Sequence, residues 1–346
     1  MEYSKKFHGS PTDTSGTIGL TDFEDEDVWT CVSCRLCVQR CPRGIEVPDI
    51  MRALRRVIVE VGVGKAPDSL RIAIKNISGV GNPLGEPSEK RTDWVKDLGV
   101  KTYTKGTEIL YFPCCYQVYD PSIQRVARAT VNILKKASVD FGILGGNEVC
   151  CGESARKAGS ESLFQSLAQN NINLFNEAGA SKIVVTSPHC YHTFKEEYPE
   201  FGSNFEVIHF SQYLYDLIKE GRIKFTKELN KKVTYHDSCF LGRYAGIYDE
   251  PRQVLESIPG LELVEMRDNR EYALCCGGGG GRVWEETKRG ERFSDMRIEQ
   301  ALETKASVLA AACPYCMINF EDSLLTSDKG DVIEIRDIAE LVQEAI

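Results

Sequence analysis

Short apolar runs alternate with amphipathic stretches over most of the chain, and this pattern predicts strands and helices in turn. In the middle of the sequence, β-branched and aromatic runs predict strands at 109–112, 141–144, 183–187 and 207–210. An apolar period of 3.6 residues predicts helices at 126–137, 154–178 and 213–219. Strands that alternate with helices are typical of parallel sheets with helices on both faces.

The rest of the chain repeats this plan, with strands predicted at 233–235, 261–265, 308–312 and 332–335 and helices at 285–302 and 338–345. The cysteines repeat too: Cys115, Cys150 and Cys190 recur as Cys239, Cys275 and Cys313, at offsets of 124, 125 and 123 positions. A near-constant offset predicts duplicated α/β halves, 107–225 and 226–346, facing each other across a pseudo-twofold axis. Cysteines at the carboxyl ends of parallel strands would then meet in the crevice where such sheets bind ligands.

The part of the chain before residue 107 lacks this alternation. Residues 1–25 are polar, and we expect them to form a tail or an arm that binds a partner. A small helical, ferredoxin-like module is expected over 26–80, in which a helix at 47–61 would place on one face Ile50, Leu54, Val57, Ile58 and Val61. Glycine and proline are frequent between 81 and 106, a composition typical of a linker.

Composition narrows the class of protein. The chain has 346 residues, enough for two or three domains, and its formal net charge of −9 argues against a general nucleic-acid surface. Apolar runs fall well short of the roughly 20 residues that span a bilayer, and the N-terminal residues resemble neither a signal peptide nor a lipidation site. We therefore expect a cytoplasmic protein that meets the cytoplasmic membrane, if at all, through a partner.

Fourteen cysteines, most of them in tight groups, argue for metal ligation rather than for a secreted disulfide scaffold. The first group has the ferredoxin-type spacing C-x2-C-x2-C-x3-C-P of a [4Fe–4S] site and comprises Cys31, Cys34, Cys37 and Cys41. A zinc knuckle is the alternative. In two-cluster ferredoxins the fourth cysteine of such a run serves the other cluster. Either Cys41 or a residue from elsewhere would therefore complete this site.

A second group lies in the second half and comprises Cys239, Cys275, Cys276, Cys313 and Cys316. Its segments follow predicted strands, which indicates a metal or cluster site assembled from several loops. The adjacent Cys275 and Cys276 point in different directions and could bind different irons of an extended cluster. The glycine run 277–281 would let backbone N–H groups approach the sulfurs. A phosphate loop is the rival interpretation, although the run does not complete G-x-G-x-x-G.

The first half carries an incomplete copy of this group. It has Cys115, Cys150, Cys151 and Cys190, but Thr193 stands where the second half has Cys316. Cys114 directly precedes Cys115 and could supply a fifth thiolate, and His192 is a further candidate. The sequence leaves open whether this half binds a cluster.

Other side chains near the cysteines have two interpretations each. His236 could protonate a leaving thiolate or act as a hydrogen-bonding neighbour of the site, and His189 has the same ambiguity beside Cys190. Asp237 could cap a turn or orient His236. A basic group near the first cysteines would either dock an acidic redox partner or form a solvated helix face; it comprises Arg40, Arg43, Arg52, Arg55 and Arg56.

The spacing Cys239-x35-Cys275-Cys276-x36-Cys313-x2-Cys316 resembles the CCG motif of heterodisulfide reductase catalytic subunits. The flanking segments HDSCFLGRYAGIYDEPRQVLESIPG, LCCGGGGGRVWEE and ACPYCMINFED are similar to the D-type subunit. WTCVSCRLCVQRCPRGIEVPDIMRALR is similar to a cluster motif of the C-type subunit. The chain thus resembles a C-type tail fused to a B-type body, which is the D-type arrangement.

The resemblance implies a [4Fe–4S] cubane at the first cysteine group and a noncubane [4Fe–4S] cluster at the second-half group, with a third cluster in the first half left open. It implies an iron–sulfur oxidoreductase that moves electrons from the cubane to the noncubane cluster, which reduces a disulfide or oxidises thiols. The small substrate would be a thiol or a disulfide. The protein partner would be a flavoprotein or a b-type membrane subunit.

Two other functions are compatible with the sequence. The incomplete first half and the single cubane motif favour an electron-transfer subunit without a substrate of its own. Such a subunit would link a flavoprotein or dehydrogenase to a quinone-linked membrane partner. A zinc-stapled structural protein is the third interpretation, and colourless, iron-free protein from an anaerobic purification would be needed to sustain it.

Overall fold

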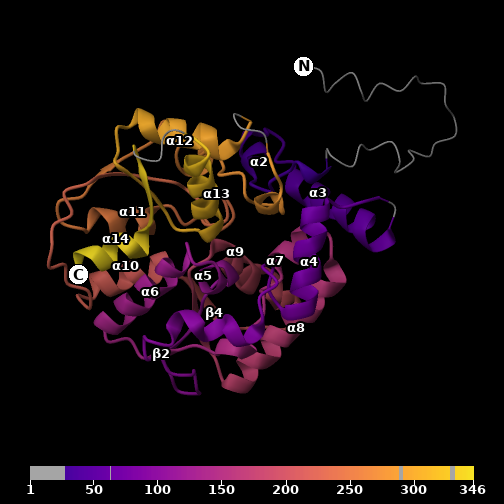
Figure 1. Cartoon of the computed structure of the whole chain (residues 1–346), viewed down its shortest axis with the longest axis horizontal. Helices are drawn as coiled ribbons and strands as arrows, with labels where there is room; N and C mark the ends of the chain where they lie inside the picture. Colours follow the sequence, from indigo (N-terminus) through magenta and orange to yellow (C-terminus); the bar gives the residue numbers. More distant parts are fainter. Residues whose placement is uncertain (1–27, 63, 288–290, 328–331) are drawn as a thin grey trace.

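The computed structural model describes residues 28–346 except residues 63, 288–290 and 328–331, and shows a helical N-terminal segment followed by two α/β halves (Figure 1). The tail expected at residues 1–25 lies outside the described residues. Each half holds a four-stranded parallel sheet, in the orders β2-β1-β3-β4 and β6-β5-β7-β8. The duplicated α/β architecture predicted from the sequence is confirmed.

The first sheet is built from β1 (Ile109–Phe112), β2 (Phe141–Gly142), β3 (Lys182–Val185) and β4 (Glu206–His209). The α-helices of this half are α5 (Cys115–Tyr119), α6 (Gln124–Lys136), α7 (Glu153–Lys157), α8 (Glu161–Ala178), α9 (Pro188–His192) and α10 (Phe210–Lys219). Tighter or wider turns are η5 (Gly145–Asn147), η6 (Thr193–Glu197) and η7 (Tyr198–Phe201). The helix predicted over 154–178 divides at Gly159, which has a φ of +85° and would place a Cβ 2.4 Å from the Arg55 backbone.

The second sheet is built from β5 (Lys232–Tyr235), β6 (Glu262–Val264), β7 (Val308–Ala311) and β8 (Glu334–Asp337). Its helices are α11 (Asp249–Glu256), α12 (Phe293–Glu303), α13 (Pro314–Leu325) and α14 (Ile338–Ala345), and its short 3-10 turns are η8 (Arg270–Tyr272) and η9 (Arg282–Trp284). Helices α11 and α13 were not predicted from the sequence. The prediction that a helix begins at Glu285 was wrong, because this residue is extended with φ −99° and ψ 133°.

The two halves pack through equivalent helices. α6 packs on α14, and α10 packs on α11. Helices α6 and α11 follow the equivalent strands β1 and β5, and helices α10 and α14 follow the equivalent strands β4 and β8. A rotation that exchanges the two halves therefore turns the contact of α6 with α14 into the contact of α11 with α10. This is the relation that the predicted pseudo-twofold axis requires. One hydrophobic core runs through both halves and includes the ten cysteines from Cys114 to Cys316.

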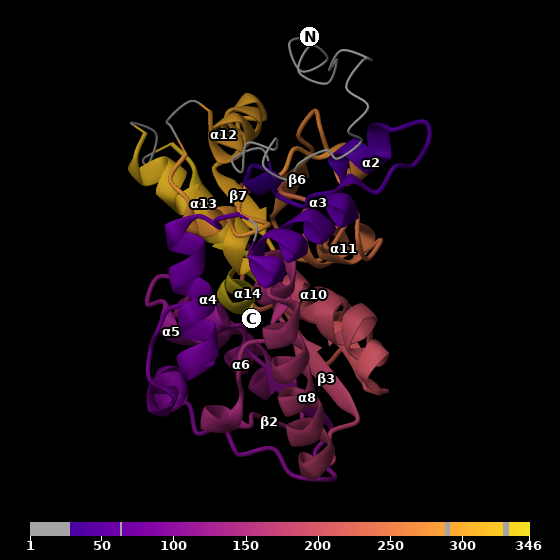
Figure 2. The same cartoon turned by 90° about the vertical axis from the view of Figure 1, so that its right-hand side faces the viewer.

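The N-terminal segment contains α2 (Leu36–Arg40), α3 (Val47–Arg56), the π-helical η3 (Val57–Val61), α4 (Asp68–Val80) and the 3-10 helix η4 (Ser88–Val95). It contacts both halves, since α3 and α4 pack on α7 of the first half while α2 and α4 reach η8 and η9 of the second (Figure 2). A second, smaller core joins Trp29, Ile58 and Leu70 of this segment to Ala158 of the first half.

Two expectations for this segment were wrong. The helix over 47–61 becomes π-helical at Val57, which shifts the register of the apolar face; Ile58 is buried, but Ile50 and Val61 are 50% and 68% exposed. The glycine- and proline-rich stretch 81–106 is not an exposed spacer, because its Arg91 and Trp94 are buried against the first half. Among the described helices, none combines the length and the apolar character needed to cross a membrane.

Candidate metal centres

The cysteines of the second half meet at the carboxyl edge of their sheet. Segments after β5, β6 and β7 bring their thiols into one continuous series of sulfur contacts, which runs through Cys239, Cys275, Cys276, Cys316 and Cys313. All of these side chains are buried. The structure therefore brings together the whole second-half group that the sequence singled out.

Neighbouring groups lower the pKa of two of these thiols, Cys276 and Cys313, whereas contact with the Cys239 thiol raises the pKa of Cys275 and burial raises that of Cys316. Contacts with the Cys275 and Cys316 thiols hold the pKa of Cys276 well below its usual value, although burial opposes them. Burial raises the pKa of Cys313, but the Cys316 thiol and His189 lower it to about 6. The backbone N–H of Gly277 donates to the Cys275 sulfur over 3.3 Å. Thiolates with N–H donors aimed at sulfur are the donor set that iron–sulfur clusters use.

His236 lies directly against this group. A ring nitrogen of His236 and the sulfurs of Cys276 and Cys316 lie within 4.8 Å of one another. Arg297 Nε donates to His236 Nδ1 over 3.2 Å, so a neutral ring carries its proton on Nε2. Burial lowers the pKa of His236 although contact with the Cys276 thiol opposes it, and Nε2 has no hydrogen-bond partner within the described chain. This geometry favours a neutral hydrogen-bond donor to sulfur over a charged proton donor.

Asp237 does not orient His236. Its carboxylate accepts two hydrogen bonds from the Arg252 guanidinium, of 2.7 and 2.9 Å, and one of 2.7 Å from the backbone N–H of Arg270. The residue that orients the imidazole is Arg297 from α12, which is fully buried. Nothing in the cysteine spacing marks this arginine, and the sequence analysis missed it.

The N-terminal cysteines border the second-half group. The Cys34 thiol contacts the Cys275 thiol, and this contact lowers the pKa of Cys34 to about 6. Burial and the nearby charges of Cys34 and Cys31 raise the pKa of Cys37, the exposed member of the group. The Cys41 sulfur faces the backbone N–H groups of residues 43–45. Thus Cys31, Cys34 and Cys37 lie together, and Cys34 also touches Cys275 of the second-half group.

Side chains from elsewhere bind the carbonyl oxygens of this N-terminal loop. Arg243 Nε donates to Cys34 O over 2.5 Å, Tyr244 Oη donates to Ser33 O over 2.9 Å, and Arg55 Nη2 donates to Cys31 O over 2.7 Å. Arg55 therefore does not belong to a solvated or docking face, as the sequence analysis allowed, because it is completely buried. The loop is held in place by the second half and by α3.

The glycine run 277–281 packs on the same loop. A Cβ on Gly279 would lie 2.3 Å from the carbonyl oxygen of Val32, and one on Gly280 would lie 2.4 Å from that of Cys31. Only glycine permits this approach. Because carbonyl oxygens occupy the space above the run and would repel an anion, the rival interpretation as a phosphate loop fails.

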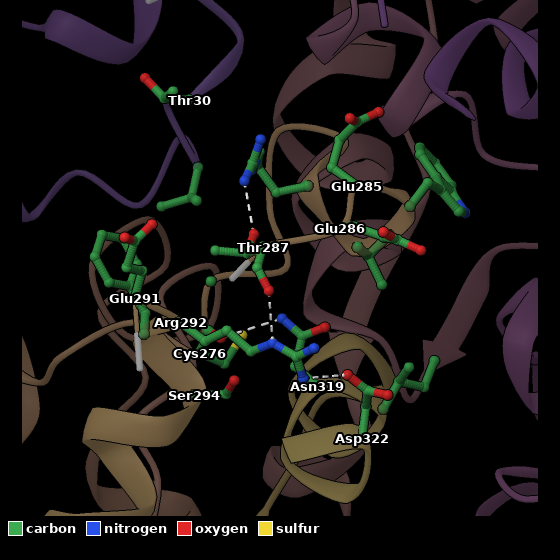
Figure 3. Close-up of a pocket in the computed structure, with 17 residues that line it drawn as sticks. Thr30, Cys276, Glu285, Glu286, Thr287, Glu291, Arg292, Ser294, Asn319 and Asp322 are labelled. Atoms are coloured by element: carbon green, nitrogen blue, oxygen red, sulfur yellow. Dashed lines mark hydrogen bonds and ion pairs between the residues drawn. The ribbon is translucent and has the colours of Figure 1, made fainter. Parts of the chain in front are cut away.

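A cavity of about 800 Å³ opens beside Cys276 (Figure 3). Arg292 crosses its wall, where its Nε donates to Thr287 O over 3.0 Å and its Nη1 lies 2.7 Å from Asp322 Oδ2. The carboxylates of Glu285, Glu286 and Glu291 also line the cavity. Of the second-half cysteines, Cys276 borders this cavity.

The first half has a comparable series of sulfur contacts, which runs through Cys115, Cys150, Cys151, Cys190 and Cys114. His192 lies outside this series, because its ring packs on Phe240 and Tyr244 of the second half. His189 also contacts residues of both halves. Its Nδ1 lies 3.2 Å from Oε1 of Glu153 in the first half. Its ring stacks on Phe240 of the second half, with 4.1 Å between the ring centroids, and contacts Cys313.

Comparisons with known proteins agree with this arrangement. The family described as the cysteine-rich domain, CCG, matches residues 109–195 and 233–321. The D-type subunit of the dihydromethanophenazine:CoB–CoM heterodisulfide reductase of Methanosarcina barkeri is 35% identical over 94% of this chain and 80% of its own length. The EtfAB:quinone oxidoreductase of Syntrophomonas wolfei subsp. wolfei is 36% identical over 93% of this chain and 47% of its own length. The chain thus spans about half the length of that second relative.

The solved structure of a hypothetical protein from Helicobacter pylori has the same fold, with a TM-score of 0.56 over 92% of this chain and 61% of that one. Its sequence identity to this chain is 9%, so the likeness concerns the fold alone.

Proposed function

This chain belongs to the family of D-type heterodisulfide reductase subunits with CCG domains, and from that premise we propose that it reduces a disulfide, or oxidises two thiols, at the second-half cysteines. The coarser function follows from the family: the chain is an iron–sulfur oxidoreductase. In this proposal Cys31, Cys34, Cys37 and Cys41 hold a cubane, and the second-half group holds a noncubane cluster. Bound in these places, the clusters would supply one-electron redox chemistry.

The position of Cys276 carries the proposal. Its sulfur belongs to the continuous thiol series, lies beside the His236 ring, and lines a cavity large enough for a small substrate. A disulfide that becomes two thiols takes up two electrons and two protons. The cavity would bring such a molecule to the edge of the thiol group at Cys276, whose side chain is 3% exposed.

The N-terminal segment supports the electron path. Cys37 is exposed, whereas Cys34 of the same group contacts Cys275 of the second-half group. We infer that residues 26–80 form the domain at which a protein partner, a flavoprotein or a b-type membrane subunit, exchanges electrons. The halves 107–225 and 226–346 form the body in which the substrate reacts, in the cytoplasm or at the inner face of the membrane.

A second candidate function is that of an electron-transfer subunit between a flavoprotein and a quinone-linked membrane partner. The exposed Cys37 and the likeness to a protein named EtfAB:quinone oxidoreductase favour it. In both functions, electrons pass between the protein partner and the N-terminal cysteine group. They differ in whether the cavity beside Cys276 admits a substrate.

The test is to reduce the anaerobically purified full chain and to mix it with low-molecular-weight disulfides. Disulfide reduction predicts reoxidation of the clusters with release of free thiol. The variant Thr287→Trp, which fills the cavity wall, should slow this reoxidation at least about tenfold, whereas Lys136→Trp, at an exposed position of α6 that does not line the cavity, should not. Reoxidation by a quinone analogue but by no disulfide would reject the reductase in favour of the electron carrier.

A further inference from the structure

We propose that the surface around Cys37 docks an acidic redox protein, which exchanges electrons with the N-terminal cysteine group. The inference rests on the proposed function, in which that group holds a cubane, and adds the chemistry of the partner and the place where it binds. The docking face is formed by α2, the loop after α2 and the neighbouring turn η8, and it comprises Cys37, Arg40, Pro42, Arg43, Ile45 and Tyr272.

The charge of the chain is unevenly distributed. Residues 28–80 contain nine lysines and arginines but four aspartates and glutamates, a formal net charge of +5, whereas the whole chain has −9. The Debye length is about 10 Å at 0.1 M salt, so a protein that approaches this segment meets its local charge rather than the net charge of the chain. A positive segment on a negative protein favours a negatively charged partner.

The five arginines of the basic group near the first cysteines differ in their surroundings. Arg55 is buried, and Arg52 and Arg56 are each paired with an acidic neighbour. Arg40 and Arg43 are exposed and have no ion-pair partner among the residues that the structure describes. These two arginines of the cysteine loop are therefore available to the carboxylates of a partner.

Cys37 lies on the same surface. Of the fourteen cysteines, all of which belong to the described residues, Cys37 alone is exposed. Cys34 of the same group contacts Cys275 of the second-half group. The N-terminal group thus has one thiol at the surface and another against the next thiol group. A carrier that covers Cys37 is oxidised by one electron as the N-terminal cluster is reduced by one, or the reverse.

Apolar side chains lie among these cations. Ile45 is 48% exposed and Tyr272 is 50% exposed. Tyr272 belongs to η8, which packs against α2, and Figure 2 shows α2 at the edge of the molecule. Apolar and aromatic groups with a charged rim are typical of surfaces that bind another protein.

An anionic membrane would also attract these arginines, but the face fits a protein better. Basic motifs that bind lipid surfaces cluster four to eight lysines and arginines or lie along an amphipathic helix. Here the unpaired cations of the cysteine loop are Arg40 and Arg43, and α2 has five residues. Two cations beside an exposed thiol match a small acidic patch around a redox centre.

The test mixes the anaerobically purified full chain with flavodoxin, an acidic flavoprotein that carries one electron at a time. Calorimetry with both proteins oxidised measures the affinity, and stopped-flow absorbance with reduced flavodoxin measures the rate of cluster reduction. If flavodoxin docks on the basic face, affinity and rate should both fall about tenfold as the salt concentration rises from about 0.05 to about 0.5 M. Values that rise with salt, as when two net negative proteins repel each other, would overturn the proposal.

Charge reversal locates the face. Arg40→Glu/Arg43→Glu should weaken binding and slow reduction at low salt at least about tenfold. The matched control Arg71→Glu/Lys75→Glu changes exposed positions of α4, which packs on α7 and η9. This control should change either value less than about twofold, and equal losses in the two double variants would overturn the assignment.

The EPR signal of the dithionite-reduced N-terminal cluster reports whether each variant is folded and loaded, and the salt dependence of the wild type decides the matter if a variant does not fold. Reoxidation of dithionite-reduced protein by disulfides tests the proposed function separately, because it needs no docking partner. A charge-reversed variant that keeps the flavodoxin rate but loses binding to vesicles of anionic phospholipid would overturn the proposal and assign the face to a membrane.

Discussion

The guanidinium of Arg55 donates a hydrogen bond of 2.9 Å to the carbonyl oxygen of Gly280, which lies 225 positions further along the chain. It also donates to the carbonyl oxygens of Val28, Cys31 and Lys157. Lys157 belongs to the first half and Gly280 to the second. One buried side chain therefore ties the N-terminal cysteine loop to both halves.

Replacing Arg55 should destabilise the protein strongly. Arg55→Met leaves several buried carbonyl oxygens without a donor, and we expect a loss of about 3 kcal/mol or more in the free energy of unfolding, measured with denaturant. Arg56 on the same helix is exposed, and its ion-pair partner among the described residues is Glu60. Arg56→Met should therefore stay within about 0.5 kcal/mol of the wild type. Equal effects of the two variants would contradict the assigned role of Arg55.

Gly279→Ala tests the close approach of the glycine run to the N-terminal loop. The new Cβ would lie 2.3 Å from the carbonyl oxygen of Val32, so one of the two backbones must move. We expect a loss of about 1–3 kcal/mol in stability and greater protease sensitivity around Cys31. Gly79→Ala is the control, because nothing lies within 4 Å of its Cβ position in α4. This control should be neutral or stabilising, and a neutral Gly279→Ala would show that the contact is loose.

His236→Leu should lower the midpoint potential of the second-half cluster without loss of iron. The neutral imidazole that Arg297 orients offers its N–H to sulfur, and such hydrogen bonds stabilise the more negative, reduced state. An EPR-monitored redox titration measures the change. His209→Asn is a suitable control, since His209 caps α10 through Ser211. Loss of iron from His236→Leu would instead identify His236 as a ligand.

Stability should fall as the pH rises from about 4 to about 8, through Asp337. Burial raises the pKa of this carboxyl to about 8 in the folded protein, whereas an unfolded aspartate has a pKa of about 3.9. As the pH rises, the unfolded chain therefore releases this proton at a lower pH than the folded chain does. The folded state loses up to about 1.4 kcal/mol per pH unit across that window.

Asp337→Asn should remove this part of the pH dependence. Asparagine keeps the acceptor that caps α14, where Asp337 Oδ1 accepts from the N–H of Ala339 over 2.8 Å. Urea unfolding at several pH values measures the slope, and the exposed Asp216→Asn should retain the slope of the wild type. An unchanged slope in Asp337→Asn would show that other groups cause it.

The strands were well predicted from the sequence, for a physical reason. Short β-branched runs have few other stable arrangements. The pairing of Cys150 with Cys275 reflects the repeat, whereas the pairing of Cys190 with Cys313 was wrong, because Ser187 and Cys313 both precede the proline that begins a helix. The helix over 338–345 was predicted with its observed bounds, because Asp337 and Glu340 form a capping box at its start.

The relations between distant segments could not be predicted in this way. Arg55 lies on an amphipathic helix and has the sequence signature of an exposed residue; its burial depends on carbonyl groups from three remote segments. Arg91 lies in a glycine- and proline-rich stretch, and only the fold shows that its charge meets Glu148 and Cys115. The contact between Cys34 and Cys275 likewise follows from packing, not from spacing.

The packing of α6 on α14, and of α10 on α11, has a consequence for biosynthesis. The first repeat leaves the ribosome before the helices that cover it have been made. Until then α6 and α10 lack the helices that cover them in the folded chain. The first repeat therefore stays prone to aggregation, or dependent on a chaperone, until α11 and α14 have been synthesised.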